Sequence, residues 1–198
     1  MQHYFISKDH KESDYFSYTD TINGKTYTFK SVDSVFSKDK IDDGTRVLLD
    51  TVLNEYDDIT GKVLDFGCGV GVIGIVLKDN YENADVTMCD INKTCIELSS
   101  KNIKTNNVEC TIIESNLYEN IKDNFDYIIT NPPIKVGKEI LFAVVSDGYL
   151  HLNNGGHMVL VIRKSHGEES MKKHMTNIFG NCEILKRDKG YYILRSIK

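Results

Sequence analysis

The sequence predicts an α/β fold: a mostly parallel seven-stranded sheet, with helices on both faces and an N-terminal β-hairpin. From Lys62 onward, short apolar runs alternate with longer segments of helical periodicity, the order expected of parallel strands joined by helices. The two most distinctive segments, residues 67–71 and 131–133, each directly follow a strand-like run. Because ligands bind such sheets at the carboxyl ends of the strands, both segments are expected at one edge of the sheet.

The N-terminal part predicts a hairpin and then a helix. Residues 14–31 alternate between apolar and polar side chains on both sides of Asn23-Gly24. Asn-Gly favours the tight turn of a hairpin because both central positions of that turn need positive φ. After an irregular segment, apolar residues at helical spacing predict a helix over residues 45–57, with Thr45 as its candidate N-cap.

The rest of the chain is expected to form the sheet and its covering helices. Asn92 is a candidate helix cap, and an antiparallel strand pair is expected to close the sheet. No internal repeat or low-complexity linker is visible, so we expect one domain over residues 1–198, with residues 1–32 as the hairpin extension and 33–198 as the core. The expected strands lie near residues 62–66, 85–90, 108–113, 125–130, 156–163, 182–187 and 191–197, and the expected helices near 71–79, 92–105, 137–151 and 167–179.

The composition is that of an ordinary globular protein, since 40% of the 198 residues are hydrophobic and 27% are charged. No apolar run approaches the roughly 18 residues of a membrane span, and the N-terminus lacks the layout of a signal peptide, so a cytoplasmic protein is expected. The 5 cysteines include no C-x-x-C pair and the 6 histidines no H-x-x-x-H pair. This predicts neither a disulfide framework nor a metal site.

The formal net charge of −5 argues against indiscriminate nucleic-acid binding, which depends on Lys and Arg contacts to phosphates. A local basic face is compatible with this charge, although scattered, solvated side chains are the simpler interpretation. The basic residues concerned all lie in the C-terminal half: Lys135, Lys138, Arg163, Lys164, Lys172, Lys173, Lys186 and Arg187.

A glycine-rich turn follows the first strand of the sheet. Gly67, Gly69 and Gly71 alternate there, and glycines let the backbone turn sharply and approach a ligand without an intervening Cβ. Proteins that bind S-adenosylmethionine and proteins that bind dinucleotides both use this device. Gly69-x-Gly71-x-x-Gly74 also satisfies the dinucleotide fingerprint, so an NAD-dependent enzyme is the alternative.

Two carboxylates bear on the choice of cofactor. If the turn begins at Asp65, its carboxylate lies at the pocket edge, near the positively charged amino-acid end of S-adenosylmethionine. In the dinucleotide register, Asp65 would instead be buried unpaired in a parallel strand, which is costly. Asp90 ends the second strand and can accept hydrogen bonds from both ribose hydroxyls of either cofactor. We therefore expect S-adenosylmethionine.

Asn131-Pro132-Pro133-Ile134 predicts a site for an amine. The lone pair of an exocyclic amine is delocalised, so its nitrogen needs acceptors aimed at its hydrogens as it attacks a methyl group. The side-chain carbonyl of Asn131 and the main-chain carbonyl of Pro132 can supply two such acceptors, and the prolines stiffen the loop. Ile134 gives less stacking on a base than an aromatic residue, which weakens the adenine and protein-glutamine interpretations.

With these motifs the chain resembles the RsmC-like class I methyltransferases, which methylate the exocyclic N2 of a guanine in small-subunit ribosomal RNA. It looks like the single-domain form of that family, without a duplicated N-terminal half. The segments that carry the resemblance are His3-Tyr4-Phe5, Val35-Phe36-Ser37, Asp42-x-Gly44-Thr45, the glycine-rich turn, Asn131-Pro132-Pro133-Ile134-Lys135-Val136-Gly137-Lys138 and Gly190-Tyr191-Tyr192.

The resemblance implies a Rossmann-like fold, S-adenosylmethionine as cofactor and a defined set of binding residues. Asp65 and the first two glycines would line the methionine side of the donor, Asp90 its ribose and Asn116, where the family usually has Asp, its adenine. Two residues of the Val-Phe-Ser segment would help to close the pocket. The full set of expected cofactor-binding residues is Asp65, Phe66, Gly67, Gly69, Gly71, Asp90, Ile91, Asn116, Phe36 and Ser37.

The sequence thus supports the hypothesis of an S-adenosylmethionine-dependent methyltransferase that acts on a guanine N2 of 16S rRNA, as naked RNA or in the small ribosomal subunit. Asn131, Pro132, Pro133 and Ile134 would form the catalytic segment, and Lys135 and Lys138 would contact RNA phosphates. The alternatives are methylation of adenine N6 or of a protein glutamine, and a catalytically silent donor-binding module that assists ribosome assembly.

Overall fold

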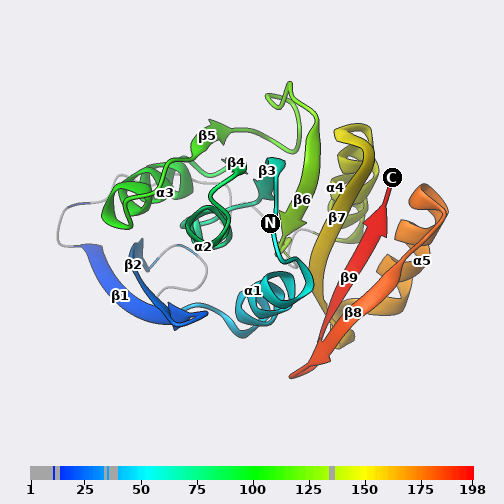
Figure 1. Cartoon of the computed structure of the whole chain (residues 1–198), viewed down its shortest axis with the longest axis horizontal. Helices are drawn as coiled ribbons and strands as arrows, with labels where there is room; N and C mark the ends of the chain where they lie inside the picture. The colour runs from blue at the N-terminus through cyan, green and yellow to red at the C-terminus, as the bar shows by residue number, and fades with distance from the viewer. Residues whose placement is uncertain (1–10, 12–13, 34, 36–39, 134–136) are drawn as a thin grey trace.

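The computed structural model describes residues 11, 14–33, 35, 40–133 and 137–198, and its middle layer is a seven-stranded sheet in the order β5-β4-β3-β6-β7-β9-β8 (Figure 1). All neighbouring strands are parallel except β9, which runs antiparallel to both β7 and β8. The predicted α/β fold is confirmed. The strands are β3 (Gly61–Phe66), β4 (Ala84–Asp90), β5 (Thr111–Glu114), β6 (Phe125–Thr130), β7 (Leu152–Arg163), β8 (Glu183–Asp188) and β9 (Tyr191–Ile197).

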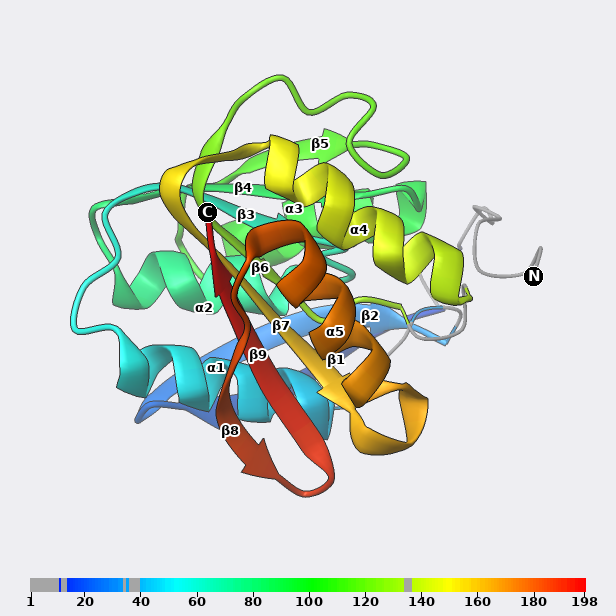
Figure 2. The same ribbon diagram turned by 90° about the vertical axis from the view of Figure 1, so that its right-hand side faces the viewer.

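Helices cover both faces of the sheet, three on one side and two on the other (Figure 2). Side chains alternate between the faces along each strand, so Val63 and Ile129 contribute to the core under α1, α2 and α3, while Leu64 and Ile128 contribute to the core under α4 and α5. No described helix is both long and apolar enough to cross a membrane. The helices are α1 (Asp43–Glu55), α2 (Val72–Asn80), α3 (Lys93–Thr105), α4 (Lys138–Leu150), the short 3₁₀ helix η4 (Lys164–His166) and α5 (Glu168–Phe179).

The N-terminal hairpin is present as predicted. β1 (Tyr15–Ile22) and β2 (Lys25–Val32) pair antiparallel across Asn23-Gly24, whose φ angles of 50° and 73° are those that the Asn-Gly turn requires. Two side-chain amides, of Asn102 in α3 and of its C-cap Asn106, extend the hydrogen bonding of β2. The Thr28 N–H donates to Asn106 at 3.0 Å, and the Lys30 N–H donates to Asn102 at 2.7 Å. The hairpin is thereby fastened to the side of the sheet that α1, α2 and α3 cover.

The predicted cap of α3 is confirmed, but that of α1 is wrong. Asn92 caps α3, because its side chain accepts a hydrogen bond from the Thr94 N–H at 2.9 Å. The N-cap of α1 is Asp42, whose carboxylate accepts from the N–H groups of Gly44 and Thr45, and Thr45 lies inside the first turn. Asp is as good a cap as Thr, and its oxygens reach the same unpaired N–H groups from an earlier position.

Two strand boundaries also differ from expectation. β5 begins only at Thr111, because the Val108 N–H donates to the carbonyl of Ile103 and so completes the end of α3. β7 begins at Leu152 rather than 156, since its ladder with β6 is irregular: Leu152 pairs with Phe125, and the next partner of β6 is His157. The Gly155-Gly156 pair lies in this irregular stretch, where Gly155 has a φ of 80°.

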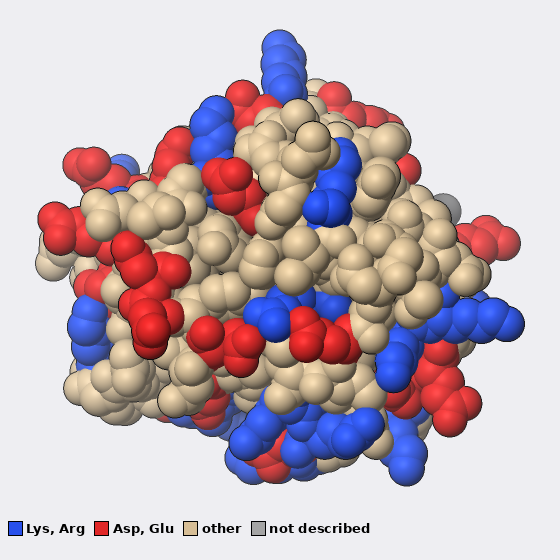
Figure 3. Space-filling view, turned by 45° about the vertical axis from the view of Figure 1, so that its right-hand side comes forward, with Lys and Arg blue, Asp and Glu red and all other residues tan. Residues whose placement is uncertain are grey.

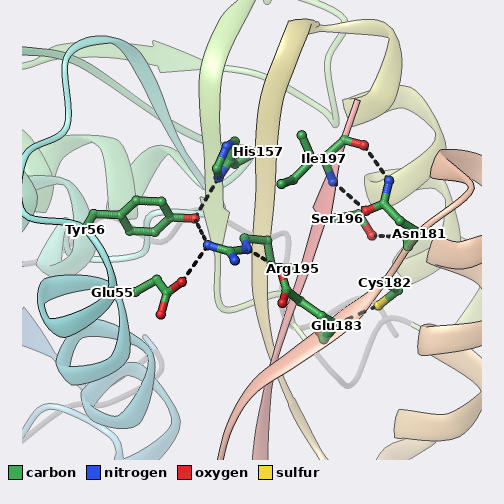
Figure 4. Close-up of polar contacts among 9 residues, drawn as sticks. All are labelled: Glu55, Tyr56, His157, Asn181, Cys182, Glu183, Arg195, Ser196 and Ile197. Atoms are coloured by element: carbon green, nitrogen blue, oxygen red, sulfur yellow. Dashed lines mark hydrogen bonds and ion pairs between the residues drawn. The ribbon is translucent and has the colours of Figure 1, made fainter.

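A polar cluster ties the C-terminal end of α1 to the sheet (Figure 4). Arg195 on β9 donates to Glu55 at 2.9 Å and to the hydroxyl of Tyr56 at 3.3 Å. The same hydroxyl lies 2.8 Å from Nδ1 of His157 on β7, and Glu183 on β8 accepts from Nε of Arg195 at 2.6 Å. Because α1 also carries residues of the site described below at its other end, this cluster helps to set the position of the helix.

His157 makes the stability of this cluster dependent on pH. Burial, and then the charge of Arg195, lower the pKa of His157 below its ordinary value of 6.5. Near and below pH 6.5, His157 binds a proton more readily in the unfolded chain than in the folded chain. The contribution of His157 to the free energy of unfolding therefore falls as the pH falls. We expect the free energy of unfolding in urea, taken as the difference between the wild type and a His157→Gln variant, to decrease between pH 7.5 and 6.0, by less than the roughly 1.4 kcal/mol per pH unit of one whole proton. A difference that stays constant over this interval would contradict the assignment.

Candidate active site

The predicted motifs meet at the carboxyl edge of the sheet. The hydroxyl of Thr130, at the end of β6, donates to the carbonyl of Phe66 at the end of β3, at 2.7 Å. The N–H groups of Gly67 and Cys68 both donate to the carbonyl of Cys89 on β4, at 2.9 Å each. The glycine-rich turn, Asp90 and the Asn-Pro-Pro segment therefore surround one region, although they lie far apart in the sequence.

The glycines of the turn differ in what surrounds them. Gly67 and Gly69 have φ angles of 71° and 57°. A Cβ on Gly67 would meet only Cδ of Pro133, at 3.9 Å, and one on Gly69 would have no described atom within 4 Å. These two positions therefore leave open backbone that a ligand can approach. Gly71 instead caps α2, where a Cβ would lie 3.2 Å from Oγ of Ser99, so its contacts are those of internal packing.

Asp65 lies deeper than the sequence analysis placed it. β3 continues through Phe66, so the turn begins at Gly67 and Asp65 is fully buried inside the strand. The interpretation that the turn begins at Asp65 is wrong, and so is the argument it gave against an NAD-binding register. Periodicity could not show this, because an apolar strand buried on both faces reads as an unbroken run wherever it ends.

The Asp65 carboxylate is only half satisfied. Its Oδ2 accepts from the N–H of Gly74 at 2.8 Å, while its Oδ1 is buried and has no hydrogen-bond partner within the described part of the chain. Burial, with a smaller contribution from the charge of Asp90, raises the pKa of Asp65 to about 7. A cationic group at the turn would favour the ionised form and lower this pKa again. An ammonium group therefore fits the site better than a phosphate does.

Asp90 is the anchor of the turn and lines the neighbouring cavity. Its Oδ2 accepts from the Gly69 N–H at 3.0 Å and its Oδ1 from the Asn92 N–H at 2.9 Å, which fixes the carboxylate. Burial nevertheless raises the pKa of Asp90. Each oxygen keeps a further lone pair that can accept from a ligand hydroxyl.

The cavity brings together six of the predicted site residues with a largely apolar wall. Asn116 is exposed, lines the cavity and donates to Oε1 of Glu119 at 2.9 Å, which restrains its amide. Phe66, which also lines the cavity, stacks on the buried ring of Tyr118 at a centroid distance of 4.7 Å. The lining residues are Phe66, Gly67, Cys89, Asp90, Ile91, Ser115, Asn116, Leu117, Pro133, Ile140 and Val144.

The side chain of Asn131 is held in one orientation. Its Nδ2 donates to Oγ1 of Thr45 at 2.8 Å and lies 3.2 and 3.3 Å from the two carboxylate oxygens of Asp42. The Thr45 hydroxyl donates its own proton to Asp42, so its oxygen is free to accept from the amide. These acceptors identify the nitrogen side of the amide, and the carbonyl oxygen of Asn131 has no protein donor among the described residues.

Asp42 and Thr45 are the site residues that sequence reasoning missed. Thr45 was interpreted as a helix cap, and both residues appeared in the Asp42-x-Gly44-Thr45 segment of the resemblance without a role in the site. The start of α1 contacts Asn131 from a position more than 80 residues earlier in the chain. No local sequence pattern predicts such a contact. The one sequence feature that pointed to these two residues was the Asp42-x-Gly44-Thr45 segment of the resemblance.

The remaining expected site residues lie around the cavity, farther from it, or outside the described part of the chain. Pro132 is buried beside Asn131, and Pro133 lines the cavity. Lys138 is exposed as the first residue of α4, with its ammonium 5.0 Å from the ring centroid of Phe142. Within the described residues, no group of His, Cys, Asp and Glu side chains is arranged to hold a metal ion. Four expected residues lie outside the described part of the chain: Phe36, Ser37, Ile134 and Lys135.

Comparison with known proteins identifies relatives over the whole length of the chain. An uncharacterized Bacillus subtilis protein, YbxB, is 32% identical over 200 residues, which is 100% of this chain and 98% of that protein. Ribosomal RNA small subunit methyltransferase C is 33% identical in Vibrio parahaemolyticus, over 89% of this chain and 51% of the relative, and 36% identical in Haemophilus influenzae, over 86% and 51%. The chain spans about half the length of these methyltransferases.

Among solved structures, a 16S rRNA N2 methyltransferase, RsmC, from T. thermophilus matches with a TM-score of 0.85 and 25% identity. The match covers 93% of this chain and 50% of that one, which was solved in complex with AdoMet and guanosine. A further methyltransferase structure, from Streptococcus mutans, shares the fold at a TM-score of 0.70 and 15% identity, over 96% of this chain and 57% of that one. The resemblance to RsmC-like proteins is thus confirmed.

The family model of the methyltransferase small domain matches residues 26–195, which include strands β3 to β8, most of β9, the glycine-rich turn and the Asn-Pro-Pro segment. The chain therefore belongs to the methyltransferase small domain family.

Proposed function

We propose that this protein transfers a methyl group from S-adenosylmethionine to the exocyclic N2 amine of a guanine in 16S rRNA. The observation that carries the proposal is the fixed amide of Asn131, whose carbonyl is left as an acceptor in the same short segment as Pro133, which lines the cavity. The relatives named as small-subunit ribosomal RNA methyltransferases support RNA as the substrate, and the relative solved with guanosine supports guanine as the base.

The residues of the site fit S-adenosylmethionine. Its methionine ammonium would satisfy the unpartnered Oδ1 of Asp65, and its ribose hydroxyls would donate to Asp90. Gly67 and Gly69 would allow its approach, and Asn116 would bond the adenine edge. When bound, the cofactor supplies a methyl group on a positively charged sulfur, which makes that methyl group an electrophile.

The contribution of the protein is to orient the amine. The Asn131 Oδ1 and the Pro132 carbonyl would accept the two N–H bonds of the guanine N2, which turns the nitrogen lone pair toward the methyl group. Acceptors that are already held in place need no reorganisation in the transition state. No base has to act beforehand, because the N–H becomes acidic only as the new bond forms. The carbonyl oxygens are too weakly basic to keep that proton, which then leaves to water.

Asp90 is expected to act on donor binding, both directly and through the glycine-rich turn that it anchors. Asp90→Ala removes a charged acceptor for two hydroxyls, and hydrogen bonds to charged groups contribute about 1.5–3 kcal/mol each. The affinity for S-adenosylhomocysteine, measured by calorimetry, should fall by at least roughly tenfold. The matched control is Asp85→Ala, which removes an exposed carboxylate at the other end of the same strand. Equal affinities of the two variants would remove Asp90 from the ribose site.

The proposed reaction is tested with labelled S-adenosylmethionine and small ribosomal subunits reconstituted from unmethylated, transcribed 16S rRNA, with large subunits as the control acceptor. After digestion to nucleosides, label should appear as N2-methylguanosine in the small subunit. Label in N6-methyladenosine or in a protein glutamine would show that adenine or glutamine, and not guanine, accepts the methyl group. Binding of S-adenosylhomocysteine without transfer to any of these acceptors would instead identify a silent binding module.

A further inference from the structure

Basic residues that looked scattered in the sequence converge at one end of the sheet. Arg163 ends β7 and pairs with Tyr191 of β9, and the Lys164 N–H donates to the carbonyl of Gly190 in the β8–β9 turn at 2.9 Å. Arg187 of β8 pairs with Tyr192. We call the resulting set of five exposed cations the hairpin surface: Arg163, Lys164, Lys186, Arg187 and Lys189.

The positive charges of the hairpin surface lie close together and form no ion pairs with carboxylates of the described residues. Figure 3 shows Lys and Arg side chains gathered at the lower edge of the molecule, where Figure 1 places the end of the β8–β9 hairpin. Asp188 is the one carboxylate within the two segments 163–164 and 186–189. None of the ion pairs formed within the described residues includes any of the five cations. In a chain of net charge −5, this is a local positive field that no carboxylate of the described residues neutralises by an ion pair.

Two tyrosines lie beside these cations, Tyr191 on one face of β9 and Tyr192 on the other. The guanidinium of Arg163 lies 5.3 Å from the ring centroid of Tyr191, and that of Arg187 lies 5.5 Å from that of Tyr192. Such pairs hold the guanidinium plane in place while its N–H groups stay free for phosphate oxygens. Aromatic rings and guanidinium planes are also the groups on which unpaired bases stack in single-stranded RNA.

The hairpin surface is continuous with the amine site. The ring of Tyr191 lies against Gly44, where a Cβ would be only 2.9 Å from Cε1 of that ring. The Gly44 N–H donates to Asp42, which also accepts from the amide of Asn131. A strand of RNA that places one base at Asn131 would therefore carry its neighbouring phosphates over the cations.

We propose that the hairpin surface binds the RNA backbone next to the target guanine. This inference builds on the proposed function and gives its substrate a second contact region, separate from Lys135 and Lys138. The cations, the tyrosines and the contact with Gly44 favour RNA over an acidic protein partner, which would need neither stacking groups nor a path to the amine site.

The test compares Lys186→Gln/Arg187→Gln with the control Lys104→Gln/Lys122→Gln, which removes the same charge from exposed positions outside this surface. Methyl transfer to reconstituted small subunits and to transcribed 16S rRNA is measured between 50 and 200 mM salt. The hairpin variant should raise KM roughly tenfold and reduce the slope of log affinity against log salt by about 1.4, for two lost phosphate contacts. Its kcat and its affinity for S-adenosylhomocysteine should match those of the control.

A KM and a salt slope equal to those of the control would overturn the hairpin surface while leaving the methyl transfer intact. A raised KM without a change of salt slope would also contradict it, because lost phosphate contacts must alter that slope. If the wild-type protein transfers no methyl group, the proposed function fails, and filter binding of both variants to the transcribed 16S rRNA still tests the surface. Equal binding by the two variants would then overturn it.

Discussion

Asn131→Ala is expected to reduce the single-turnover rate of methyl transfer to small subunits by roughly 10²–10³-fold, the usual effect of removing one preorganised group that stabilises a transition state. The carbonyl oxygen of Asn131 is held in place by bonds on the other side of its amide, so alanine removes an acceptor that costs no reorganisation. The side chain is only half-buried and does not line the cavity, so the affinity for S-adenosylhomocysteine should persist.

The matched control for this variant is Asn124→Ala, which truncates an exposed amide in the loop before β6. Its rate should equal that of the wild type. An Asn131→Ala protein that binds the donor and transfers methyl groups within about threefold of the control would show that the carbonyl does not act on the amine.

Asp42→Ser is expected to lower the same rate by roughly 10- to 100-fold with little change in stability. Serine caps a helix as well as aspartate does, so the N-terminus of α1 keeps its acceptor. The carboxylate that orients both the Asn131 amide and the Thr45 hydroxyl is lost, so the amide is free to rotate. The measurements are the single-turnover rate and the free energy of unfolding in urea.

Two further variants separate the roles of Asp42. Asp43→Ser changes an exposed carboxylate one residue later and should leave both quantities unchanged. Thr45→Val keeps the shape of the side chain but removes the hydroxyl that accepts from Asn131, so it should lower the rate as Asp42→Ser does. An Asp42→Ser protein with the wild-type rate would mean that Thr45 and the backbone fix the amide of Asn131 without the carboxylate.

Much of this fold could be predicted from short-range sequence patterns. Asn23-Gly24 predicted the hairpin, Asn92 predicted the start of α3, and the alternation of strand-like and helical segments predicted the mostly parallel sheet. Each of these features depends on side chains within a few residues of one another. The glycine-rich turn and Asp90 were recognised for the same reason, because they follow directly on their strands.

The rest depended on contacts that no local pattern contains. Asp65 was placed at the pocket edge because an apolar run does not reveal where a buried strand ends. Asp42 was missed because it reaches Asn131 only when α1 packs against the sheet, over β7 and β9. The cations of the hairpin surface appeared scattered because residues 163–164 and 186–189 are far apart in the sequence. The pairing of β9 with both β7 and β8 brings them to the same end of the sheet.

The most direct test of the proposed chemistry is a crystal structure of this protein with S-adenosylhomocysteine and guanosine. It should place the guanine N2 at about 2.7–3.2 Å from the Asn131 Oδ1, hydrogen-bond distance, with the amide nitrogen still on Asp42 and Thr45. A guanine bound elsewhere, or with another edge toward Asn131, would contradict the assignment of this amide as the group that orients the amine.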